Sequence, residues 1–156
     1  MLIGVPGSGK STWIKAQNFD MARTLIASTD NQIETLAAAA GKTYNDVFSE
    51  LIKSATAAMN HQVREAIQVG ADIVWDQTNV SVRSRQPKLA LIPAGYKKVA
   101  VVFPTPDKTE LDRRLASRPG KTIPGHVVQS MAANLEMPTV AEGFDEVKVL
   151  QNGPAN

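Results

Sequence analysis

The stretch Gly4-Val5-Pro6-Gly7-Ser8-Gly9-Lys10-Ser11 fits the pattern G-x-x-x-x-G-K-[ST]. It follows the short apolar run Met1 to Ile3 and precedes residues that suit a helix, which is the strand-loop-helix setting that the pattern requires. Glycines at positions 4, 7 and 9 allow backbone N–H groups to turn toward phosphate oxygens, and the start of the next helix adds partial positive charge. The stretch therefore predicts a phosphate-binding loop at the start of an α/β domain.

The loop also supplies side chains for a nucleotide. Lys10 is expected to reach the β- and γ-phosphates, and the Ser11 hydroxyl to ligate Mg²⁺. No Asn-Lys-x-Asp sequence for guanine occurs in the chain, so ATP is the expected nucleotide. The residues expected to bind it are Gly4, Pro6, Gly7, Ser8, Gly9, Lys10, Ser11 and Thr12.

Further apolar runs at 24–28, 73–75, 98–103 and 147–150 predict four more strands. Helical patterns lie between them at 11–18, 43–70, 83–92, 106–117 and 124–135, with Thr43 and Thr105 as expected caps, Pro106 at a first helical position and Pro119-Gly120 as a stop. This alternation predicts a P-loop NTPase-type, three-layer α/β/α fold with a mainly parallel sheet of about five strands. We expect a single domain over residues 1–156, with a helical, arginine-bearing lid at about 106–124.

Composition limits the class of protein. The 156 residues are 43% hydrophobic, include no cysteine and show neither a signal peptide nor a bilayer-spanning run, so a soluble, cytoplasmic protein is expected. Residues 1–76 carry six Lys/Arg against eight Asp/Glu, whereas residues 83–121 carry ten against three. The basic segment, residues 83–121, is compatible with a solvated surface and with an anion-binding one.

Two aspartates follow predicted strands, where parallel strands present their carboxyl ends to a ligand. Asp76 is placed like the strand-end acid that supports Mg²⁺ in phosphate-loop proteins. Asp30 is free to accept a proton from an acceptor hydroxyl. Either residue could instead cap a helix, but two of them beside a phosphate loop favour catalysis.

Arg114 and Arg118 lie four residues apart and share one face of the predicted lid helix. An arginine at the end of such a helix can neutralise the charge that develops on a transferring phosphoryl group, and we expect Arg118 to do so. The alternative is a basic helix end that complements its own dipole.

Five stretches together resemble the polynucleotide 5′-hydroxyl kinase family, the kinase domains of bacteriophage and animal end-healing enzymes. They are PGSGKSTW from Pro6, the aspartate that closes the second strand, DQTN at 76–79 with Arg83 and Arg85 behind it, RRLASRPGKTIP at 113–124, and MPTVAEGFDEV at 137–147. The resemblance runs in order over nearly the whole chain, and its later motifs are much narrower than the phosphate loop. It also suits a phage-encoded protein that acts in the host cytoplasm.

The resemblance implies Asp30, Lys10 and Arg118 as catalytic residues, with Arg114 near the nucleotide. It implies Ser11 as a Mg²⁺ ligand, beside the Asp76 expected from its strand-end position, and a nucleic acid or nucleotide as the acceptor. Where the family has an arginine that grips the acceptor's phosphate, this chain has Asn31, Gln32, Ile33 and Glu34. The residues expected to bind the acceptor are Asp76, Thr78, Asn79 and Arg83.

The function that these residues predict is transfer of the γ-phosphoryl group of ATP to a hydroxyl of a nucleic acid or nucleotide. One alternative is a kinase of a hydroxymethylated base in DNA, of a nucleoside or of another small molecule. Another is a nucleotide-dependent RNA-binding module with little transfer activity. A base at Asp30 and an arginine at position 118 favour an enzyme, because a binding module needs neither.

Overall fold

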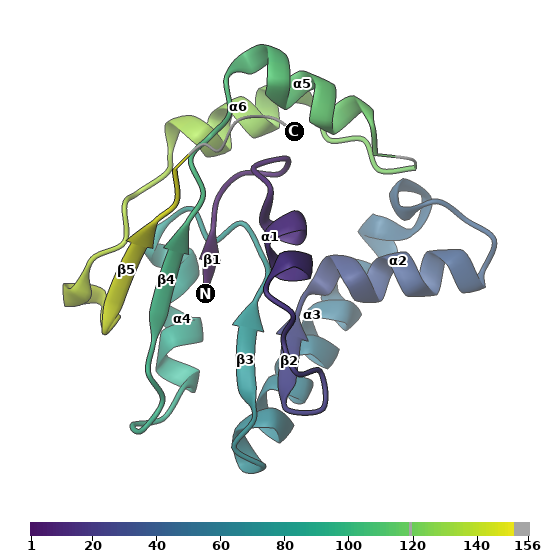
Figure 1. The fold of residues 1–156 in the computed structure, drawn as a ribbon. Coiled ribbons are helices and arrows are strands. Elements are labelled where there is room, and N and C mark those ends of the chain that lie inside the picture. Colours follow the sequence, from purple (N-terminus) through teal and green to yellow (C-terminus); the bar gives the residue numbers. More distant parts are fainter. Residues whose placement is uncertain (119, 152–156) are drawn as a thin grey trace.

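The computed structural model describes residues 1–118 and 120–151, and it has helices on both faces of a parallel sheet (Figure 1). The strands are β1 (Leu2–Ile3), β2 (Thr24–Ala27), β3 (Asp72–Trp75), β4 (Val99–Val102) and β5 (Glu146–Val149). The helices are α1 (Lys10–Ala16), α2 (Thr29–Ala39), α3 (Tyr44–Gln68), α4 (Val82–Leu91), α5 (Lys108–Ala116) and α6 (Gly125–Ala133), with a short 3₁₀ helix, η1, at Val140–Glu142. The predicted three-layer α/β/α fold is confirmed.

The strands form two parallel ladders, β1-β4-β5 and β2-β3, where the sequence predicts one sheet of about five strands. The ladders meet where β1 runs beside β3, at a seam that contains two hydrogen bonds. The Gly4 amide donates to the Thr78 carbonyl at 2.9 Å, and the Asn79 side chain donates to the Leu2 carbonyl at 2.7 Å. The very short β1 explains the split, because it leaves little backbone for a ladder with β3.

Successive residues of a strand point to opposite faces of the sheet, and the core divides accordingly. Leu2 packs with Val101 and Phe103 on the face that α1 covers, where Trp13 joins them. Ile3 packs with Leu89 of α4 on the other face, which α3 also covers. The helix α5, within the predicted lid, and the helix α6, which follows the lid, lie over the carboxyl ends of the strands (Figure 1).

Several predicted boundaries are correct. Thr43 caps α3 as expected, and its side chain forms a capping box with Asp46. The helix predicted at 106–117 instead begins at Lys108, because the Asp107 side chain accepts from the Glu110 amide at 3.0 Å and forms the cap in place of Thr105. Pro119, part of the predicted stop, lies outside the described residues.

The helix α2 was not expected from the sequence. Ser28 directly follows β2 and caps α2, since its hydroxyl accepts from the Asn31 amide at 3.3 Å. Ile33 and Ala37 of α2 are buried against α3. Asp30 therefore lies in the first turn of a helix and not in a loop beyond a strand.

None of the helices within residues 1–118 and 120–151 has the length and apolar character needed to span a bilayer.

Candidate active site

The phosphate-binding loop turns sharply from β1 into α1. Gly7 and Gly9 adopt left-handed backbone conformations, with φ of 82° and 102°, that other residues rarely adopt. A side chain at Gly7 would also approach Leu111 of α5 to 3.0 Å, and one at Gly4 would approach the Ser8 hydroxyl to 2.7 Å. The backbone of this loop is therefore fixed by glycines and packed directly beneath the lid.

Lys10 is buried at the centre of the loop, with 9% of its surface exposed. Its ammonium donates to the carbonyl oxygens of Gly4 at 2.9 Å and Val5 at 3.0 Å, and the salt bridges of the described residues do not include it. Burial lowers the pKa of Lys10 to about 8, against the attraction of the nearby Asp76 carboxylate. The loop thus holds a cation that only neutral groups contact, which suits an anionic ligand.

A second feature of the loop fits phosphate oxygens. Among the described residues, the Ser8 hydroxyl is the one buried side-chain polar group with no hydrogen-bond partner. Such groups usually have a partner in the working protein. Ser11 and Thr12 expose their side chains in the first turn of α1. The loop therefore offers a hydroxyl, an ammonium and backbone amides to the phosphates of a nucleotide.

Asp30, in the first turn of α2, is held by two donors. Its Oδ1 accepts from the Tyr44 hydroxyl at 2.7 Å, and its Oδ2 accepts from the Lys121 ammonium at 2.6 Å. Burial raises the pKa of Asp30, but the hydrogen bonds and charge of its partners outweigh burial and leave that pKa below its ordinary value. Asp30 is therefore a fixed, ionised carboxylate at neutral pH.

Lys121 comes from the lid and is buried between two carboxylates. Besides Asp30 it contacts Glu34, one turn along α2, at 3.0 Å, and its ammonium lies 4.0 Å from the centre of the Tyr44 ring. Sequence reasoning missed both Lys121 and Tyr44 as site residues. No spacing in the sequence indicates either partner, because Tyr44 and Lys121 lie 14 and 91 positions from Asp30.

A cavity of about 540 Å³ lies beside Asp30, and the phosphate loop reaches its lining through Pro6. Pro6, Asp76 and Thr78 line it together with Asp30 and Lys121, so the structure brings these predicted residues together. Burial raises the pKa of Asp76, an effect that the Lys10 charge opposes. Two carboxylates thus line one cavity: Asp76 directly after β3, and Asp30 in the first turn of α2, the helix that follows β2.

Two arginines of the lid lie near the loop. The Arg114 guanidinium donates to the Gly7 carbonyl at 3.2 Å and to the Glu110 carboxylate at 2.6 Å. Arg118 is half-buried. Burial has the largest effect on the pKa values of Lys10 and Asp30, and the charge of Arg118 makes a smaller contribution that lowers both. Of the two predicted arginines, Arg114 therefore contacts the loop, whereas Arg118 is not among the residues that line the cavity and its role stays a prediction.

Two residues predicted to bind the acceptor do not line this cavity. Asn79 is fully buried at the seam, where its amide donates to Leu2 and Gln77 carbonyls and its oxygen accepts from Lys88, so it has no group left for an acceptor. Arg83 is exposed and lines a separate groove. Asn79 therefore supports the end of β1, and of the DQTN stretch only its first three residues reach the cavity.

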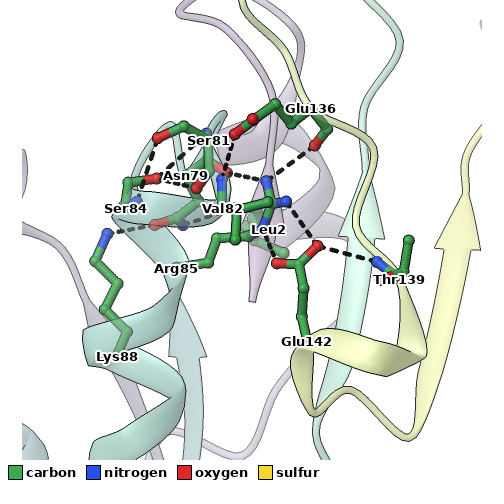
Figure 2. Close-up of polar contacts among 10 residues, drawn as sticks. All are labelled: Leu2, Asn79, Ser81, Val82, Ser84, Arg85, Lys88, Glu136, Thr139 and Glu142. Atoms are coloured by element: carbon green, nitrogen blue, oxygen red, sulfur yellow. Dashed lines mark hydrogen bonds and ion pairs between the residues drawn. The ribbon is translucent and has the colours of Figure 1, made fainter.

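Arg85, near the start of the basic segment, has no exposed surface. Figure 2 shows its polar contacts. The Arg85 guanidinium donates twice to the Glu142 carboxylate, at 2.8 Å each, and to the backbone carbonyls of Asn79 and Glu136 at 3.0 Å. Glu142 also accepts from the Thr139 amide, and Arg85 lowers its pKa. The stretch from Met137 to Val147 thus anchors the seam and takes no part in the cavity.

The charge of the basic segment is largely neutralised within the fold. Six of its ten cationic residues form salt bridges with carboxylates, and these are Arg85, Lys97, Lys108, Arg113, Arg114 and Lys121. The high net charge of this segment in the sequence therefore does not translate into an equally basic surface.

The described residues contain no group of three or more acidic, histidine or cysteine side chains that could hold a metal ion. Mg²⁺ in phosphate sites is usually held by one or two protein ligands, with phosphates and water completing its shell. Ser11 and Asp76 stay the predicted ligands for such an ion, and of the two only Asp76 is among the residues that line the cavity.

The sequence was compared with models of known protein families. A model described as an AAA domain matches residues 1–138. The match includes the phosphate loop, both aspartates of the cavity and the lid, and it ends just before η1. Together with the loop geometry, it makes this region a nucleotide-binding P-loop domain.

Proposed function

Because the chain belongs to the family of AAA domains, we propose that it is an ATP-dependent phosphotransferase that phosphorylates an alcohol. The observation that carries this proposal is the Asp30 carboxylate, ionised and held by Tyr44 and Lys121, in a cavity that Pro6 of the phosphate loop also lines. A protein that only bound a nucleotide would have no use for an oriented base there.

The donor half of the reaction belongs to the phosphate loop. The loop amides, Lys10 and the Ser8 hydroxyl hold the β- and γ-phosphates of ATP. Ser11 and Asp76 would hold Mg²⁺, which neutralises phosphate charge when it is bound. Arg118 swings with the lid to balance the charge on the transferring group, and Arg114 keeps the lid helix against Gly7.

The acceptor half belongs to the cavity. The acceptor oxygen attacks the γ-phosphorus while the bond from that phosphorus to the β-γ bridging oxygen breaks, so that ADP leaves. The proton of the acceptor hydroxyl passes to Asp30. Tyr44 and Lys121 fix both oxygens of that carboxylate, so its orientation is set before the acceptor binds.

The resemblance to polynucleotide 5′-hydroxyl kinases makes a nucleic acid the first acceptor to test. A hydroxymethylated base, a nucleoside and a small metabolite are the other acceptors that offer a hydroxyl. We expect ATP and Mg²⁺ to be required with any of them.

The test is incubation of the protein with γ-labelled ATP and Mg²⁺ against a panel of acceptors. The panel contains 5′-hydroxyl DNA and RNA, DNA with hydroxymethyl bases, nucleosides and simple alcohols. Label should appear on one class, and Lys10→Met should remove it, because that variant lacks the phosphate-binding cation. A protein that binds ATP but labels nothing would support the RNA-binding module instead.

A further inference from the structure

The chemistry of the cavity beside Asp30 identifies the class of acceptor. We infer that the acceptor is a compact, partly apolar alcohol that carries no phosphate group, and not a nucleic acid strand. This inference rests on the proposed phosphotransfer and deepens it, because it concerns which hydroxyl reaches the base.

The walls of the cavity are largely apolar. Phe48 and Ile52 of α3 form one side, and Ile123, Val127 and Met131, from the loop after the lid helix and from α6, form the other. A volume of about 540 Å³ lies within the range of about 300–1,000 Å³ typical of small-molecule sites. The walls therefore suit an apolar body of modest size.

The polar groups of the cavity repel an anion. Asp30 and Asp76 both line it, and Lys121 is the one cation among the described residues that line it. The Lys121 ammonium is already bound to Asp30 at 2.6 Å and to Glu34 at 3.0 Å. A phosphate on the acceptor would therefore meet carboxylates with no unpaired cation to receive it.

Hydrogen bonds join two of the segments that line the cavity, and a strand would have to enter beside them. Asn45 at the start of α3 binds the segment after the lid helix, since its side chain donates to the Thr122 carbonyl at 3.4 Å and accepts from the Thr122 amide at 3.2 Å. The Asn45 amide also donates to the Gly120 carbonyl at 3.3 Å. A bound strand would need a basic track leading away from the cavity, and most cations of the basic segment are paired with carboxylates.

The test measures binding to the full chain without ATP, by calorimetry. The probes are 2-naphthylmethanol, 2-naphthyl phosphate and a 5′-hydroxyl oligothymidylate. The neutral alcohol should bind at least tenfold more tightly than either anion. Ile52→Asp should weaken its binding at least fivefold, because it adds charge to an apolar wall, whereas Met21→Asp, at an exposed position outside the cavity, should not.

Equal or tighter binding of the phosphate or the oligonucleotide would overturn the inference, and so would failure of the alcohol to bind at millimolar concentration. If Ile52→Asp does not fold, Phe48→Ala, at a partly exposed wall position, takes its place. Binding of a non-hydrolysable ATP analogue is measured in parallel. Failure of the analogue to bind would count against the proposed function. The inference about the acceptor is tested separately, because binding of the alcohol is measured without ATP.

Discussion

Arg85 and Lys10 are both buried cations of the same domain, but their surroundings differ in kind. Arg85 is fully buried and has a bidentate partner in Glu142, which is itself only 8% exposed. Lys10 contacts two neutral carbonyl oxygens, and burial lowers its pKa to about 8. The scaffold neutralises its buried charge internally, whereas the phosphate loop leaves its charge for a ligand.

In its surroundings, Lys121 is intermediate between Arg85 and Lys10. It is 5% exposed and paired, like Arg85, but its partners Asp30 and Glu34 expose 47% and 51% of their side chains. A carboxylate that water reaches can also be reached by a substrate hydroxyl. Both pairs contain a buried cation. The Lys121–Asp30 pair therefore differs from the Arg85–Glu142 pair in the exposure of its carboxylate.

The largest change in stability is expected at the seam. Glu142→Gln keeps the shape of the side chain but leaves the Arg85 charge buried without its counter-ion. Removing one partner of a buried pair typically costs about 3–5 kcal/mol, so the free energy of unfolding should fall by about 3 kcal/mol in urea denaturation followed by circular dichroism.

The matched control for this variant is Glu146→Gln on β5. Glu146 pairs with the exposed Lys97 and Lys148, so its loss should cost less than about 1 kcal/mol. Equal losses in the two variants would mean that Arg85 and Glu142 do not form a special anchor.

A smaller effect is expected from the ionisation of Lys10. The protonated ammonium binds phosphate, and with a pKa of about 8 the free protein loses this proton as the pH rises above 8. ATP affinity, measured by calorimetry, should therefore fall about fivefold between pH 8 and pH 9. Lys10→Arg keeps its charge across this range and should show no such fall. If the ATP affinity of the wild type did not change between pH 8 and pH 9, Lys10 would not be an unpaired cation with a lowered pKa.

The smallest effect is expected from Lys121→Gln. Its loss leaves Asp30 and Glu34 half-exposed to water, so the free energy of unfolding should fall by about 1 kcal/mol or less. The same urea denaturation measures it. A fall as large as that of Glu142→Gln would remove the distinction between the pocket pair and the seam pair.

The sequence predicted the fold through features that are local. The loop pattern, the apolar runs of the strands and the Thr43 cap depend on nearby residues, and each is found in the structure at or near its predicted place. The helix α2 was missed because Ser28 directly follows β2 and also caps the helix, and only packing against α3 shows its buried face.

Site residues that closely follow a strand in the sequence were predicted. Site residues brought in by distant segments of the chain were missed. Asp30 and Asp76 face the cavity as their positions after β2 and β3 indicate. The partnership of Lys121 with Asp30 joins residues 91 positions apart, and no spacing in the sequence indicates it. Likewise, the positive charge of residues 83–121 was visible, but the carboxylates that neutralise Arg85 and Lys97 lie outside that segment.

The most direct test of this account is the single-turnover rate of phosphoryl transfer in Asp30→Asn, with ATP, Mg²⁺ and the best acceptor of the panel. The asparagine keeps the size of the side chain but does not accept the hydroxyl proton. The rate should fall about 10²–10⁴-fold, with ATP affinity and the free energy of unfolding close to those of the wild type. A wild-type transfer rate in this folded variant would contradict the assignment of Asp30 as the base.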